Sequence, residues 1–73
     1  MEERKYVEKL LDELKIERKH QLDFIERLRN IYNELNRKGF RPLNSLLHQI
    51  ATWEQNLSLV EKQIEELEGI LKN

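Results

Sequence analysis

One short segment, Gly39–Pro42, interrupts a sequence that is otherwise suited to helix; it holds the single Pro of the chain and one of its two Gly. A Gly just past a helix end can turn left-handed at no steric cost. A Pro fits the first turn of a following helix. The segment therefore predicts two helices, and a link this short allows only neighbouring, roughly antiparallel ones.

The end of the first helix is predicted in detail. If Gly39 is the first residue beyond the helix, Leu35 and Phe40 occupy the two positions that carry the apolar contact of a Schellman motif. Arg37 and Lys38 lie in the last turn, where cations suit the negative end of the helix dipole.

The start of the second helix is less sharply defined. Arg41 is a poor N-cap by residue type, so the helix could instead begin at Asn44 or Ser45. The predicted bounds within a single hairpin domain are a helix over residues 2–38, a turn over 39–42 and a helix over 42–72.

The second helix carries a regular apolar seam. Its apolar residues recur at alternating steps of three and four, which is the pattern of a coiled coil. They are Leu43, Leu46, Ile50, Trp53, Leu57, Val60, Ile64, Leu67 and Leu71.

The first helix has a broader apolar stripe that is interrupted near its middle. Its apolar residues are Val7, Leu10, Leu11, Leu14, Phe24, Ile25, Leu28, Ile31, Tyr32 and Leu35. Between the two halves, the core positions fall on Glu17, Arg18 and Gln21. An eleven-residue step from Leu14 to Ile25 predicts a local straightening of the supercoil there.

A chain of 73 residues without Cys has neither a large core nor a disulfide to stabilise it, so oligomerisation is the remaining means. We therefore expect an all-α antiparallel hairpin that forms a homodimer, a four-helix bundle or coiled coil; a trimer, a tetramer or a hetero-complex would cover the same surface. The expected oligomer or partner interface consists of Phe24, Leu28, Ile31, Leu46, Ile50, Trp53 and Leu57.

The polar interruption has two interpretations. Folding the chain about the turn places Glu17, Arg18 and Gln21 beside residues 60–64. The Arg18 side chain could then reach Glu61 or Glu65. A polar layer of this kind commonly fixes the register of paired helices. The alternative is a notch that binds a polar or acidic ligand.

Trp53, the single Trp, is expected to pack in the core; the alternative is an anchor in the dimer interface, where Trp is enriched.

Positive charge is concentrated near the turn, although the net charge of the whole chain is only −1. Dipole complementarity and solubility explain such a basic end. The alternative is contact with the phosphates of RNA or DNA. The residues concerned are Arg27, Arg29, Arg37, Lys38 and Arg41.

Reaction chemistry is not indicated by any motif. His20 and His48 are far apart in the hairpin, and carboxylates occur only in mixed charge runs typical of solvated faces. We expect no enzyme activity, no catalytic residue, no cofactor and no metal. The N-terminus lacks an apolar signal region and no long apolar run is present, so we expect a cytoplasmic protein outside the membrane.

The expected function is a non-enzymatic protein–protein interaction module, a small adaptor or regulator that binds itself, with a larger protein as a second candidate partner. Off the two stripes, Ile16, Leu22 and Leu59 are the apolar candidates for such a partner. The alternatives are a nucleic-acid-binding regulator that uses the basic turn end, and a small accessory subunit of a larger enzyme.

Overall fold

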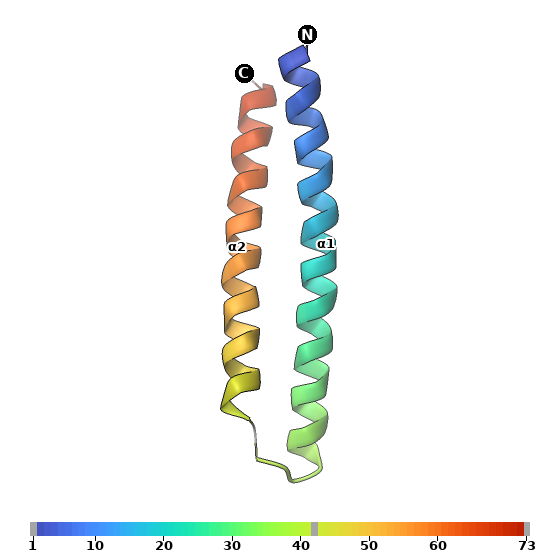
Figure 1. Cartoon of the computed structure of the whole chain (residues 1–73), viewed down its shortest axis with the longest axis vertical. Coiled ribbons are helices and arrows are strands. Elements are labelled where there is room, and N and C mark those ends of the chain that lie inside the picture. Colours follow the sequence, from blue (N-terminus) through green and yellow to red (C-terminus); the bar gives the residue numbers. More distant parts are fainter. Residues whose placement is uncertain (1, 42, 73) are drawn as a thin grey trace.

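A computed structural model describes residues 2–41 and 43–72 of the chain. It consists of two long helices, α1 (Glu2–Arg37) and α2 (Asn44–Lys72), which run antiparallel along each other (Figure 1). Both ends of the chain lie at one end of the rod and the turn lies at the other. The prediction of an all-α helical hairpin is confirmed.

The predicted Schellman ending of α1 is present. Gly39 has a φ of 88°, in the left-handed region. The Phe40 N–H donates to the Leu35 carbonyl at 3.0 Å, and the Gly39 N–H donates to the Asn36 carbonyl at 3.1 Å. These two bonds define the motif and satisfy carbonyls that the helix end leaves free. The Phe40 side chain is nevertheless 61% exposed, and α1 ends at Arg37, one residue before the predicted boundary.

The second helix begins at Asn44, two residues later than position 42 and at one of the two alternative starts. The carbonyl of Leu43 accepts the first bonds of α2, from the Leu46 and Leu47 N–H groups at 3.0 and 3.2 Å. Pro42, the predicted first residue, lies outside the described residues.

The core is a single thin layer between the helices. Its most covered residue is Ile64, which is 2% exposed. Leu11, Val60 and Ile64 form a cluster toward the open end, against which Leu14, Leu67 and Leu71 pack. Among the described residues, no side chain falls below 2% exposure. One helix therefore covers only part of the apolar arc of the other.

The register between the helices is fixed by contacts on both sides of the polar interruption. Lys15 forms an ion pair with Glu68 at 3.8 Å, and Arg29 forms one with Glu54. The residue numbers of these ion pairs add to 83, because the long ionic side chains reach along the rod. Contacts between core residues give the heights more directly: Phe24 packs on Trp53, and Leu11 packs in one cluster with Ile64, pairs whose numbers add to 77 and 75. Residue i of α1 therefore lies at about the height of residue 77 − i of α2, on both sides of Gln21.

The shape is extended. The hairpin measures 58 × 15 × 15 Å and has a radius of gyration of 16.7 Å, against about 11 Å for a compact chain of this length. Its accessible surface is 6172 Å², against about 4,800 Å² for a compact monomer of this mass. Within residues 2–41 and 43–72, neither helix has the length and apolar character needed to cross a bilayer.

Candidate interaction surface

The hairpin has two long sides of different character, and the residues next to buried ones show which side is which. Successive residues of a helix are turned by about 100°, so the neighbours of an inward-facing residue point to opposite sides of the helix pair. Leu14 faces α2, Glu13 lies on one side of it and Lys15 on the other. The same relation holds for Arg27 and Arg29 around the buried Leu28.

One side, here called the bridged side, carries Lys15, Leu22 and Arg29 on α1, and Glu54 and Glu68 on α2. Lys15, Leu22 and Arg29 are spaced by seven residues and so form one row. The ion pairs Lys15–Glu68 and Arg29–Glu54 both cross between the helices on this side. Because these side chains are about half exposed, each pair contributes about 0–1 kcal/mol. Their effect is to occupy this side with paired charges.

The opposite side, here called the groove side, is hollowed between the helices. A groove of about 500 Å³ has an apolar floor and a rim of carboxylates and an amide. Its lining residues are Leu10, Glu13, Leu14, Glu17, Gln63, Glu66 and Leu67. A second hollow of about 410 Å³ lies nearer the turn, against Arg27, Ile31 and Leu35. Within the described ranges, no ion pair crosses between the helices on this side.

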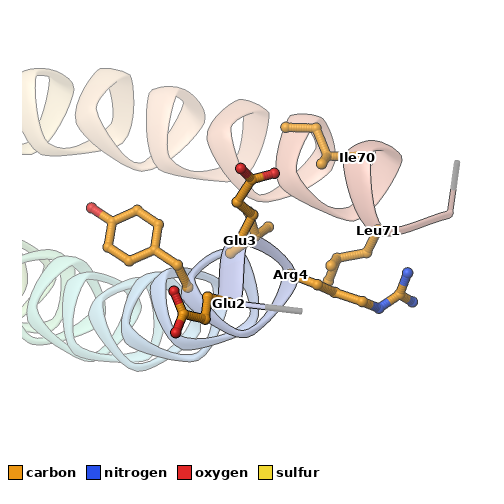
Figure 2. Close-up of a pocket in the computed structure, with 7 residues that line it drawn as sticks. Glu2, Glu3, Arg4, Ile70 and Leu71 are labelled. Carbon is orange, nitrogen blue, oxygen red and sulfur yellow. The ribbon is translucent and has the colours of Figure 1, made fainter.

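A third hollow lies at the open end, where Val7 and Leu71 line a volume of about 770 Å³. Figure 2 shows Glu3 pointing from α1 toward α2, whereas the guanidinium of Arg4 points away from the hairpin. The first turn of α1 and the last turn of α2 are therefore only loosely covered.

The groove side of α1 consists of two rows with seven-residue spacing. The inner row, nearer α2, is Leu10, Glu17, Phe24 and Ile31; the outer row is Glu13, His20, Arg27 and Glu34. The outer row has a carboxylate, Glu13, in the open half of α1, and a guanidinium, Arg27, followed by a second carboxylate, Glu34, in the turn half.

The polar interruption is centred on Gln21, which is buried with 6% exposure. Its Nε2 donates to Glu17 Oε1 at 3.1 Å, whereas its Oε1 has no hydrogen-bond partner within the described part of the chain. A buried amide oxygen without a partner costs about 1–3 kcal/mol. Arg18 is half-buried and, among residues 2–41 and 43–72, forms no ion pair with Glu61 or Glu65.

The predicted interface residues fall into three groups by exposure. Leu28 and Ile50 are 7% and 6% exposed, so the hairpin itself already covers them. Ile31 is 43% exposed, on the groove side. The residues that are half-buried between the helices, and that keep some exposed surface, are Phe24, Leu46, Trp53 and Leu57.

The predicted basic end is partly neutralised. Arg37 forms an ion pair with Glu34 at 2.7 Å and Lys38 forms one with the same carboxylate at 3.7 Å. Arg29 is paired with Glu54 on α2. Arg27 and Arg41 are exposed, but Arg27 lies on the groove side, not at the tip.

Metal-binding geometry is not present in the described ranges, which hold no group of three or more His, Asp or Glu arranged around a common point. The predicted off-stripe residues Ile16, Leu22 and Leu59 are all exposed, but Leu22 lies among the paired charges of the bridged side.

Sequence reasoning missed the difference between the two sides. The signal was present: folding the chain about the turn brings Lys15 within side-chain reach of Glu68, and Arg29 within reach of Glu54. What the pattern does not give is how far each helix is rotated about its own axis, because the broad stripe of α1 is compatible with several rotations.

The comparisons with protein-family models, with curated proteins and with solved structures found no match to this chain.

Proposed function

We propose that this protein is a non-enzymatic interaction module whose first partner is a second copy of itself, bound on the groove side. The observation that carries the proposal is the contrast between the two sides of the hairpin. Two ion pairs occupy the bridged side, whereas the groove side leaves apolar surface open along its length.

The exposed surface supports a homodimer. Each free hairpin exposes 6172 Å², whereas a compact particle of twice its mass exposes about 8,000 Å² in total. Two separate hairpins therefore have roughly 4,000 Å² more surface than such a particle. A stable interface needs only about 1,200–2,000 Å². Even a rod-shaped dimer that buries only half of this extra surface would have an interface of the size that a stable complex needs.

The partly covered aromatic pair also supports association. The Phe24 and Trp53 rings pack together, with centroids 4.9 Å apart, yet each side chain keeps exposed surface. Aromatic residues of this kind are enriched at the centres of interfaces.

The test is the mass of the protein in solution, measured by light scattering because an elongated shape distorts gel-filtration estimates. We expect twice the 8.9 kDa of the chain, and a melting temperature that rises with protein concentration. A mass of 8.9 kDa together with a concentration-independent melting temperature would refute the proposal.

A matched pair of variants locates the surface. Ile31→Glu places a charge on the groove side, and Leu22→Glu places one on the bridged side at nearly the same exposure, 43% against 48%. We expect Ile31→Glu to give monomers and Leu22→Glu to remain dimeric. The opposite result would move the interface to the bridged side.

The accessory-subunit alternative would use the same groove side for a larger protein. Monomers in isolation that gain a fixed stoichiometry only with that protein would favour it. The nucleic-acid alternative has weaker support, because Glu34 and Glu54 pair with three of the five basic residues proposed to contact phosphate.

A further inference from the structure

We propose that the second copy docks groove side to groove side with its turn at the opposite end of the rod, so that the two-fold axis passes beside His20. This orientation rests on the proposed function, since it requires a homodimer. The positions of the charges on the groove side support this orientation.

Two hairpins stacked face to face can be related by a two-fold axis in two ways. If the axis lies across the rod, the turns lie at opposite ends and α1 packs antiparallel on α1 of the second copy. If the axis runs along the rod, the turns lie at the same end and α1 packs on α2 of the second copy. The two arrangements bring different residues together.

In the opposite-end arrangement, with the axis beside His20, Glu13 of one copy lies at the height of Arg27 of the other. By symmetry the pair forms twice, along the outer row. In the inner row, Leu10 lies within a residue of the height of Ile31 of the second copy. Carboxylate therefore meets guanidinium, and apolar side chain meets apolar side chain.

Glu17 is the one inner-row residue that brings a carboxylate toward the interface centre, opposite Phe24 of the second copy. It enters with a partner already in place, because the Gln21 Nε2 donates to its Oε1 at 3.1 Å. A carboxylate that keeps a hydrogen-bond donor is less costly to cover than a bare one.

In the same-end arrangement the register of the hairpin sets the pairs, with residue numbers that add to about 77. Glu13 would lie within about two residues of the height of Glu66 of the second copy, so that like charges meet twice. Arg27 would lie beside Gln49 of the second copy and gain no ionic partner. Interfaces are arranged so that potentials of opposite sign meet, and like-charge contacts select against wrong arrangements. The groove-side charges therefore favour the arrangement in which the two turns lie at opposite ends of the rod.

Cross-linking distinguishes the two arrangements. Because the natural sequence contains no Cys, an introduced Cys is the only thiol that can react. We would introduce one thiol by His20→Cys and treat the dimer with a bismaleimide of about 10 Å reach, the spacing of packed helix axes. His20 is exposed, so the substitution leaves the core intact. The opposite-end dimer brings the two thiols together across the axis, and we expect nearly complete conversion to a covalent dimer.

Two further variants serve as matched controls. Chains with Arg27→Cys alone should not cross-link, but they should do so when mixed with Glu13→Cys chains. In the same-end arrangement, His20→Cys chains would instead cross-link to Asn56→Cys chains, because Asn56 of the second copy would lie at nearly the height of His20. A covalent product from that last mixture, and none from His20→Cys alone, would overturn the proposal.

Charge reversal gives a second readout. Arg27→Glu and Glu13→Lys should each weaken the dimer about tenfold or more, since each creates two like-charge contacts. The double variant should regain most of the loss. Both residues are exposed, so helicity by circular dichroism should not change. Single and double variants that dimerise like the natural chain would refute the pairing.

The failure of this orientation differs from the failure of the proposed function. If the unmodified chain is a monomer by light scattering, the homodimer itself is wrong. If it is a dimer and the cross-links follow the same-end pattern, only the orientation is wrong.

Discussion

The ring of Phe24 meets the indole of Trp53 edge to face, with centroids 4.9 Å apart and planes inclined by 66°. This is the one aromatic contact between α1 and α2 in the described ranges, and it joins the helices on the turn side of the polar interruption. Edge-to-face pairs add about 0.5–1.5 kcal/mol to the burial of the rings.

We expect Trp53→Ala to lower the free energy of unfolding by about 2–3 kcal/mol, somewhat less than for a fully buried Trp because the side chain keeps some exposed surface. Urea denaturation followed by circular dichroism measures the change. A double-mutant cycle with Phe24→Leu should give a coupling of about 0.5–1.5 kcal/mol. Strictly additive losses would show that the ring contact contributes nothing of its own.

The two glycines should respond oppositely to alanine. Gly39 has a φ of 88°, so Gly39→Ala should destabilise the protein by about 1–2 kcal/mol through backbone strain. A Cβ added at Gly69 meets nothing within 4 Å in the described residues, and the residue is helical, so Gly69→Ala should stabilise by about 0.5–1 kcal/mol. Thermal melts at equal protein concentration compare the two; a loss of stability in both would contradict the open space at Gly69.

Gln21→Leu should raise the melting temperature. The substitution removes a buried amide oxygen that has no partner among the described residues, and a gain of about 1–2 kcal/mol corresponds to several degrees in a domain of this size. The exposed Gln55→Leu is the matched control and should change little. A loss of stability in Gln21→Leu would mean that the oxygen gains a hydrogen bond in the assembled protein.

The basic turn end should bind polyanions only weakly. Residues 27–41 carry five cations and Glu34, but Glu34 pairs with Arg37 and Lys38 and Glu54 pairs with Arg29. With few cations unpaired, we expect a shallow dependence of heparin retention on salt, corresponding to about one to three phosphate contacts. Retention that persists at high salt, and that the triple change of Arg37, Lys38 and Arg41 to Ala abolishes, would instead favour nucleic-acid binding.

The sequence predicted what depends on local chemistry. The Schellman motif needs only Leu35, Gly39 and Phe40 in order, and its two hydrogen bonds are where the pattern indicates. The seam of α2 is likewise turned inward from Leu46 to Leu71. Both features are fixed by spacing along one helix.

What could not be predicted depends on how the helices are rotated against each other. The stripe of α1 spans more than one partner helix can cover, so spacing alone did not show that Ile31 would stay exposed while Leu28 is buried. Nor did it show that Lys15 and Arg29 would bridge to α2 on one side only. The candidate interaction surface follows from that rotation, which is a property of the packed pair.

The constant register has a consequence for the order in which the chain assembles. Arg29 and Glu54 are 25 residues apart along the chain, whereas Lys15 and Glu68 are 53 apart. Closing a long loop in a free chain is slow. Once the contacts nearer the turn have formed, however, the next pair of facing residues is joined by only a few free residues on each helix, and its contact forms quickly. The hairpin should therefore zip from Gly39 outward and open from the termini inward. Amide hydrogen exchange would show this as protection that declines steadily along both helices toward the chain ends, with the last turns exchanging first.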